Sequence, residues 1–338
     1  MLILRPPIHN SMPREGYTVN RLWSCYSMTL VLLAMLLLVP APSTQAADVS
    51  PSSDTAPYPL LASIRPIALL AQELTEGLPV QVDTLLPAGT STHDFALSPS
   101  DLVRVRGTQL LVWLGPIGEP YLAKLIGPGG IDVRWEELQG VTHLPFRSAL
   151  HDEDDEHDAH DEHHHASAWD SHLWWSIGNA LPLARTLAQR IAADRPHWAA
   201  QLQQNLQAME LRLQQQLAKQ RARLSQGAKP FLLAHDAFFY LEEDLGIRSE
   251  AALVLDPENR PGLQHLLELK QRVAKQQIQC VLTGAIVPDS LIDKIDRQPP
   301  LQRVSVDELG WDYAGARYSE WLGVSYDKLA QCMRLPAA

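Results

Sequence analysis

Residues 198–224 have the sequence WAAQLQQNLQAMELRLQQQLAKQRARL, which is rich in Gln, Leu, Ala and Arg. Leucines recur at helical spacing, at Leu202, Leu206, Leu213 and Leu217. This pattern predicts one helix of about 27 residues, roughly 40 Å long. A solvated coiled-coil stalk is the alternative, but the apolar repeat covers too few heptads to favour it. We therefore expect a rigid strut that joins two lobes.

Strand-like and helix-like segments alternate on both sides of this helix. We expect strands near 60–64, 80–86, 110–114, 231–233, 280–282 and 304–306, and helices near 67–74, 237–245, 264–277, 288–297 and 318–333. Another helix starts after Ser98, because Pro99 suits its first position and Asp101 completes a capping box. The alternation predicts an α/β fold with two lobes, each a small parallel sheet flanked by helices, joined by one long backbone helix.

The N-terminus has the layout of a secretory signal peptide. Three arginines precede an apolar run at 28–39, and small residues follow at 43–47. A membrane anchor is the alternative, but the run of about 12 residues is shorter than the roughly 20 that a spanning helix needs. Cys25 precedes the run and is badly placed to carry a lipid. We expect a signal peptide at 1–46, an N-terminal lobe at 47–180, a linking helix at 181–227 and a C-terminal lobe at 228–338.

Composition and charge exclude several classes of protein. With 338 residues, 46% of them hydrophobic, the chain is not wholly disordered, and a net charge of −11 repels the backbone of a nucleic acid. Of three cysteines, Cys280 and Cys332 remain after the signal peptide is cut. In an oxidising compartment such a pair favours a disulfide, which stabilises by up to roughly 4 kcal/mol. Two free buried thiols are the alternative.

Residues 151–165, HDEDDEHDAHDEHHH, combine eight carboxylates with six imidazoles and offer no apolar surface to a core. A merely soluble charged loop is one interpretation. The imidazoles favour a metal-handling loop that binds zinc weakly at several places and loses it below about pH 6.5. Its histidines are His151, His157, His160, His163, His164 and His165.

Three more histidines stand in segments that we expect to be ordered. His93 follows a predicted strand, His172 follows the acidic loop, and His235 follows the strand expected near 231–233. Loops at the carboxyl ends of parallel strands are where α/β sheets bind ligands. Each histidine alone has an ordinary structural interpretation, but together they indicate a site.

Several motifs carry a resemblance to a known family. They are ASIRP at 62–66, LPAG at 86–89 leading to His93, LSPSD at 97–101, VWLGP at 112–116, HLW at 172–174, AHDA at 234–237 and DPENRPG at 256–262. With the acidic insert and the cysteine pair, the chain resembles, over about 58–334, the zinc-binding periplasmic proteins of ABC importers, the ZnuA type. The resemblance implies two lobes clamped by a helical backbone, with little hinge closure, and a metal held by His93, His172 and His235.

Three imidazoles and one oxygen suit tetrahedral Zn²⁺. The family often has a carboxylate before the first histidine, but this chain has Thr92. The fourth donor is therefore expected to be water, a carboxylate of the 151–165 loop, or Asp307. The stretch 283–285 lacks an acidic residue that similar proteins have, so orientation of the imidazoles would depend on Asp94, on Asp236 or on backbone carbonyls.

The resemblance implies a monomeric, non-enzymatic periplasmic protein that captures Zn²⁺ and delivers it to the inner-membrane permease of an ABC importer with its ATPase. A zinc hydrolase is an alternative, because three histidines and water also describe a catalytic zinc. The sequence has no HExxH, GxSxG or glycine-rich phosphate loop to support it. A zinc buffer or adhesin that works without a transporter is the other alternative.

Overall fold

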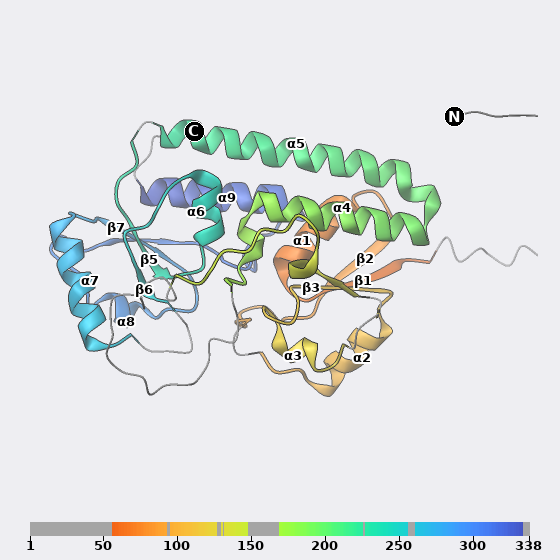
Figure 1. The fold of residues 1–338 in the computed structure, drawn as a ribbon, viewed down its shortest axis with the longest axis horizontal. Coiled ribbons are helices and arrows are strands. Elements are labelled where there is room, and N and C mark those ends of the chain that lie inside the picture. Colours follow the sequence, from red (N-terminus) through yellow and green to blue (C-terminus); the bar gives the residue numbers. More distant parts are fainter. Residues whose placement is uncertain are drawn as a thin grey trace, which may run out of the picture. The chain divides into compact units, whose positions relative to one another are not determined.

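The computed structural model describes residues 56–92, 95–126, 130, 132–147, 169–225, 227–255 and 261–333. Along these residues, strands and helices alternate before and after one long helix (Figure 1). The expected signal peptide with Cys25, the 151–165 segment with its six histidines, and His93 with Asp94 lie outside the described residues.

The first lobe contains a parallel sheet with the strand order β2-β1-β3-β4 in the described part of the chain. It includes the three strands predicted from sequence and adds a fourth. Its strands are β1 (Tyr58–Ala62), β2 (Val80–Thr84), β3 (Leu110–Trp113) and β4 (Asp132–Arg134), and its helices are α1 (Arg65–Leu74), α2 (Pro99–Gly107) and α3 (Pro120–Ala123). Strand β4 was not expected from the sequence, whereas the other three were.

The second lobe repeats this plan with the strand order β6-β5-β7-β8, again parallel. Its strands are β5 (Leu232–His235), β6 (Ala252–Val254), β7 (Cys280–Thr283) and β8 (Gln302–Ser305), and its helices are α6 (Phe239–Leu245), α7 (Leu263–Lys275), α8 (Asp289–Ile292) and α9 (Tyr318–Cys332). Strand β6 was not expected, and the helix expected at 288–297 ends at Ile292.

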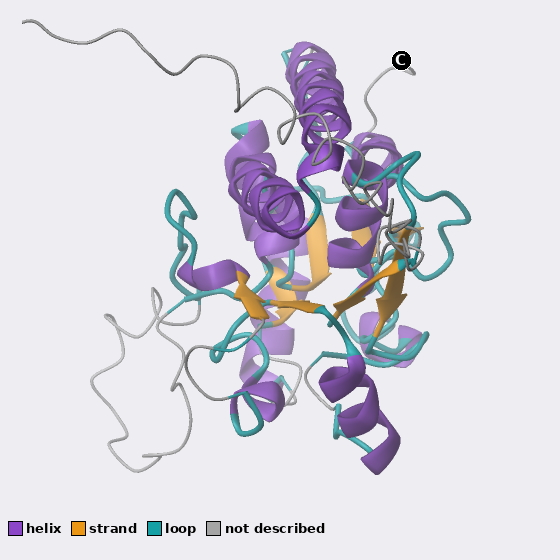
Figure 2. Ribbon diagram, turned by 90° about the vertical axis from the view of Figure 1, so that its right-hand side faces the viewer, coloured by secondary structure: helices purple, strands orange, loops and turns teal. Residues whose placement is uncertain are grey.

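Alternating side chains of each strand enter different cores. In β1, Leu60 and Ala62 join the large core with α1, whereas Leu61 joins a smaller cluster with Leu122 of α3. The side chains of β5 alternate in the same way. Leu233 packs in the large core, whereas Leu232 and Ala234 pack in a separate cluster with side chains of α7. Helices accordingly lie on both sides of the strands (Figure 2). This arrangement confirms the predicted sheets with both faces covered.

Helix α2 begins as its sequence predicts. Ser98 accepts a hydrogen bond from the backbone of Asp101, and the Asp101 carboxylate accepts one from the backbone of Ser98 at 3.0 Å. This capping box satisfies two backbone donors that the first helical turn leaves unpaired. It fixes the residue at which α2 begins.

Helix α5 (Ala199–Leu224) confirms the predicted long helix. It packs against α1, α4 (Ile177–Asp194) and α9, and buries Leu202, Leu206 and Leu213, so it is no solvated stalk. Helix α4, which contains Pro182, precedes it, so the expected linking segment 181–227 holds most of α4 as well.

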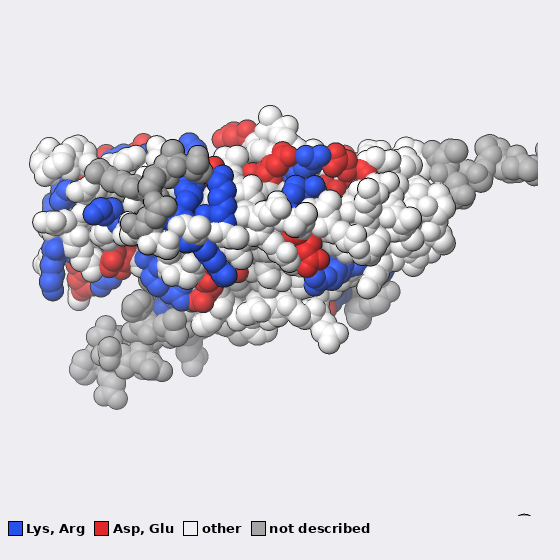
Figure 3. All heavy atoms as spheres, turned by 90° about the horizontal axis from the view of Figure 1, so that it is seen from above, with Lys and Arg blue, Asp and Glu red and all other residues white. Residues whose placement is uncertain are grey.

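Basic and acidic side chains lie side by side on the face seen in Figure 3. The boundaries of the lobes stay a prediction.

A buried carboxylate joins the helices of the two lobes. Glu73 of α1 accepts hydrogen bonds from Arg212 of α5 at 2.9 Å and from the hydroxyl of Ser319 in α9 at 2.7 Å. Its side chain is fully buried. Nearby, the rings of Trp175 and Trp321 stack with centroids 4.9 Å apart. Separating the lobes would expose these groups, which favours the small hinge motion that the resemblance implies.

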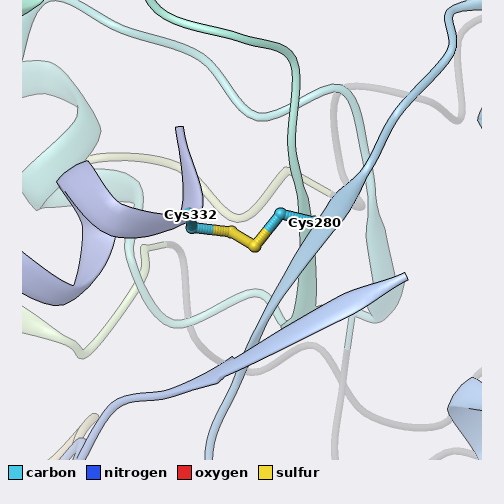
Figure 4. The surroundings of a disulfide bond; sticks show 2 residues. All are labelled: Cys280 and Cys332. Carbon is cyan, nitrogen blue, oxygen red and sulfur yellow. A yellow bond between two sulfur atoms is a disulfide. The ribbon is translucent and has the colours of Figure 1, made fainter. Parts of the chain in front are cut away.

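A disulfide joins Cys280, the first residue of β7, to Cys332, the last residue of α9 (Figure 4). Their Cα atoms are 5.5 Å apart, a usual separation for this bond. The predicted disulfide is therefore confirmed. It ties the closing helix to the second sheet at the amino end of β7, away from the carboxyl edge of the sheet where His235 lies.

In the part of the chain that the structure describes, none of the helices has both the length and the apolar character that crossing a bilayer requires.

Candidate metal centre

Two of the three predicted ligands come together between the lobes. His172 lies directly before a short 3₁₀ turn (Leu173–Trp175) of the first lobe, and His235 is the last residue of β5 in the second. Their ring centroids are 5.3 Å apart. The two residues are 4% and 1% exposed, so both imidazoles are held inside the protein. His93, the third predicted ligand, lies outside the described residues.

A carboxylate holds the ring of His172. Nδ1 of His172 lies 2.5 Å from Oδ1 of Asp170, which also accepts the backbone N–H of His172 at 2.9 Å. An ionised carboxylate only accepts, so Nδ1 carries the hydrogen and Nε2 carries the lone pair that a metal needs. Such carboxylate–histidine pairs orient the ligand and make it more basic.

Two opposing effects set the pKa of His172. Burial disfavours the charged imidazolium, but the carboxylate of Asp170, and those of Glu308 and Asp236 farther away, favour it. The result is a pKa above the ordinary value for histidine. The surroundings of His172 therefore attract positive charge, which a divalent cation supplies as well as a proton does.

A second carboxylate holds the ring of His235. Oε2 of Glu308 lies 3.3 Å from Nδ1 of His235, although 73 residues separate the two in sequence. Glu308 is 8% exposed, and its backbone carbonyl accepts Nε1–H of Trp174 from the other lobe at 3.0 Å. The sequence analysis missed Glu308, whose only signal was its position just after a strand, beside Asp307.

Asp307 and Asp236 have other partners in the structure. Oδ2 of Asp307 accepts the backbone N–H of Asp312 at 2.6 Å, and its side chain lines the same pocket as Glu308. The carboxylate of Asp236 pairs with Arg147 through Nε at 2.9 Å. The expectation that Asp236 orients the imidazoles is therefore wrong, because its carboxylate pairs with Arg147.

A pocket of about 540 Å³ opens beside His172 and beside Glu308, the partner of His235. Side chains of both lobes line it, among them Thr92, His172, Trp174, Asp307, Glu308 and Trp311. The pocket is thus lined by residues of both lobes and by the imidazole of His172, and three carboxylates, those of Asp307, Glu308 and Asp312, make its wall acidic. Such a wall favours entry of a cation.

The described chain stops and resumes close to these residues on either side of the histidine-rich segment. Before the gap, Arg147 forms ion pairs with Asp236 and with Glu242, the latter at 2.7 Å. After the gap, Asp170 contacts His172. The described residues on either side of the gap therefore contact Asp236, the neighbour of His235, and His172 itself.

Among the residues that the structure describes, no group of three or more His, Cys, Asp or Glu side chains is arranged to hold a metal ion. His172 and His235 supply two nitrogens, and a complete site needs at least one further ligand. The sequence analysis places that ligand at His93, two residues beyond the loop at Ser91 that borders the pocket.

Comparisons with known proteins bear on this site. The family model "ZnuA: Zinc-uptake complex component A periplasmic" matches residues 60–332. The high-affinity zinc uptake system protein ZnuA of Yersinia pestis is 29% identical over 269 residues, which cover 74% of this chain and 83% of the relative.

Solved structures show the same fold. "Crystal structure of ZnuA" matches with a TM-score of 0.67 at 19% identity, over 81% of this chain and 98% of that one. The SBP FpvC from Pseudomonas aeruginosa in complex with Mn²⁺ matches with a TM-score of 0.65 at 16% identity, over 82% and 98%. These likenesses support the two-lobed architecture described above.

Proposed function

This chain belongs to the ZnuA family, the periplasmic component A of zinc-uptake complexes, and we propose that it captures Zn²⁺ between its lobes for import by an ABC transporter. One observation carries this proposal. Two buried imidazoles from opposite lobes lie with their centroids 5.3 Å apart, and each has a carboxylate on Nδ1. Histidines that only fill a core do not need this paired arrangement, whereas metal ligands use it regularly.

The proposed ligands are His93, His172 and His235, with a fourth position taken by water or by a carboxylate, for which Asp307 in the same pocket is a candidate. Three neutral imidazoles suit Zn²⁺, whereas Mn²⁺ prefers oxygen ligands. A protein of similar fold was solved in complex with Mn²⁺, so the preference of this chain for Zn²⁺ over Mn²⁺ should be tested directly. Zinc is bound here as cargo, so its release matters as much as its capture.

We propose that the loaded protein docks as a monomer on an inner-membrane permease whose ATPase lies in the cytoplasm, after export to the periplasm by the signal peptide at 1–46. The family assignment supports transport rather than catalysis. The histidine-rich segment at 151–165 gathers zinc for this site, because its six imidazoles are ligands that zinc accepts.

Calorimetric melting with and without zinc tests the binding proposal. A ligand that binds only the folded protein adds about 4 kcal/mol of stability at a thousandfold excess over its Kd. After thorough chelation, addition of Zn²⁺ is expected to raise the Tm by several degrees, and Mn²⁺ at the same concentration is expected to raise it less. An unchanged Tm would contradict the proposal.

Delivery needs a separate experiment. Cells that express this protein with its permease and ATPase are expected to take up radioactive zinc at low external concentration. Uptake should stop when the permease gene is deleted. Uptake that continues without the permease would favour the transporter-independent buffer instead.

A further inference from the structure

We propose that Glu308 is a positioning residue for the metal site and that it orients the ring of His235 through Nδ1. We also propose that position 284 is a glycine because any side chain there would displace the carboxylate of Glu308. This inference rests on the proposed zinc binding and deepens it. The sequence pattern alone does not place either residue beside His235.

The contact between Glu308 and His235 defines which ring nitrogen faces the metal. Oε2 of Glu308 lies 3.3 Å from Nδ1 of His235, and at neutral pH a carboxylate accepts the hydrogen. The lone pair of the imidazole is then on Nε2. Because Glu308 is on the Nδ1 side of the ring, it lies away from a metal on Nε2, and so it orients this ligand without binding the ion.

Gly284 follows β7 and lies directly against this carboxylate. A Cβ atom added to Gly284 would stand 1.9 Å from Oε1 and 2.5 Å from Cδ of Glu308. Atoms cannot approach so closely, so any side chain at position 284 would displace the carboxylate. The stretch 283–285 lacks the acidic residue expected from the resemblance, and the Glu308 carboxylate occupies the space that a side chain there would fill.

The surroundings hold Glu308 firmly in this place. Its backbone carbonyl accepts Nε1–H of Trp174, and the side chain is 92% buried, since only 8% of the residue is exposed. Oε1 has no hydrogen-bond partner among the described residues. A buried carboxylate oxygen without a partner is costly, and a metal on His235 would reduce this cost through its positive charge. The same pattern occurs at His172, where Asp170 is the acceptor.

Four variants test this role: Glu308→Ala, Glu308→Gln, Gly284→Ala and the double variant Glu308→Ala/Gly284→Ala. Glu210→Ala is the matched control, because it removes a glutamate of α5 that pairs with Arg185 and does not line the pocket. For each protein, the Kd for Zn²⁺ is measured by competition with a chromophoric chelator. The absorption spectrum of the Co²⁺ form reports ligand number, and melting of the chelated protein reports stability.

Loss of a partner that orients a metal-binding histidine costs about 10- to 100-fold in affinity. We expect this loss for Glu308→Ala, and most of it to be recovered in Glu308→Gln, whose amide oxygen still accepts from Nδ1. Gly284→Ala should weaken binding similarly, because it moves the carboxylate. In the double variant Gly284→Ala should add nothing further. The Co²⁺ spectrum should keep its shape in all of them, and Glu210→Ala should bind like the parent protein.

Three results would overturn the inference while zinc binding by the parent protein stands. They are unchanged affinity in Glu308→Ala, independent and additive losses from the two single variants, and a Co²⁺ spectrum with one ligand fewer, which would make Glu308 a direct ligand. A fall in the Tm of the chelated protein with unchanged Kd would assign Glu308 a structural role only, which also contradicts it. Failure of the parent protein itself to bind zinc would instead contradict the proposed function, and the inference with it.

Discussion

Removal of the Cys280–Cys332 disulfide should destabilise the protein strongly and leave zinc affinity unchanged. The bond closes a loop with a sequence separation of 52 residues. Without the bond the unfolded chain gains conformational entropy, and for a loop of this length the gain lowers the free energy of unfolding by about 4 kcal/mol at 25 °C. This is a large share of the 5–15 kcal/mol that typically stabilises a folded domain.

The bond lies at the amino end of β7, whereas His235 ends the adjacent parallel strand β5 at the opposite edge of the sheet. Loss of the bond should therefore lower the free energy of unfolding and leave the Kd for zinc unchanged. Two comparisons separate the cross-link from the sulfur atoms: the oxidised protein against the same protein under reductant, and both against Cys280→Ala/Cys332→Ala.

Urea unfolding gives the free energy of unfolding, and chelator competition gives the Kd for zinc. We expect a loss of about 4 kcal/mol on reduction, with a steeper denaturant dependence because the unfolded chain expands. The double variant should lose somewhat more, since both sulfurs are buried. A loss below about 1 kcal/mol, or a Kd that rises in proportion to the lost stability, would refute this reasoning.

His235→Ala should raise the Kd for zinc by orders of magnitude, because it removes a direct ligand; tight binding that survives in a chelator competition would exclude His235 from the site. Deletion of 151–165 should lower the number of zinc ions bound in calorimetric titration and leave one tight site, and disappearance of that site would assign tight binding to the loop. Burial raises the pKa of Glu119 from its ordinary 4.5 to about 7. The folded protein then keeps a proton that the unfolded chain loses, so stability should fall by about 3 kcal/mol as pH rises from 4.5 to 7. Glu119→Gln should remove most of this fall in urea unfolding; an unchanged pH profile would show that Glu119 is ionised in the folded protein.

Elements with a strong local pattern were predictable from the sequence. The capping box at Ser98 and the leucine spacing of α5 depend on neighbours within one or two helical turns, and the structure has both. Strands β4 (Asp132–Arg134) and β6 (Ala252–Val254) were missed because three residues are too few to show alternation. Helix α8 is shorter than expected. No side chain caps its N-terminus, so the sequence held no local signal for its bounds.

The candidate site was predictable in its histidines but not in the residues that hold them. His172 and His235 occupy loops or strand ends that α/β sheets use for ligands, so their positions carried the signal. The partner of His235 is 73 residues farther along the chain, and no local pattern identifies it. Asp236 looked suitable from sequence, but Arg147, 89 residues before it, binds its carboxylate.

Asp170 illustrates a different difficulty. It lies two residues before His172 and just after a run of acidic residues, so one more carboxylate attracted no attention. Only the distance of 2.5 Å between Oδ1 and Nδ1 identifies it as the partner of the imidazole. Gly284 is similar. In the sequence it marked a missing acidic side chain, whereas in the structure it leaves space for the carboxylate of Glu308, which lies in the turn after β8.

A crystal structure of the zinc-loaded protein, with anomalous scattering recorded on both sides of the zinc absorption edge, tests the account most directly. We predict one strong anomalous peak between the lobes, about 2.0–2.1 Å from Nε2 of His172, Nε2 of His235 and a nitrogen of His93. A peak elsewhere, or rings of these histidines turned away from a common point with zinc present in solution, would contradict the account.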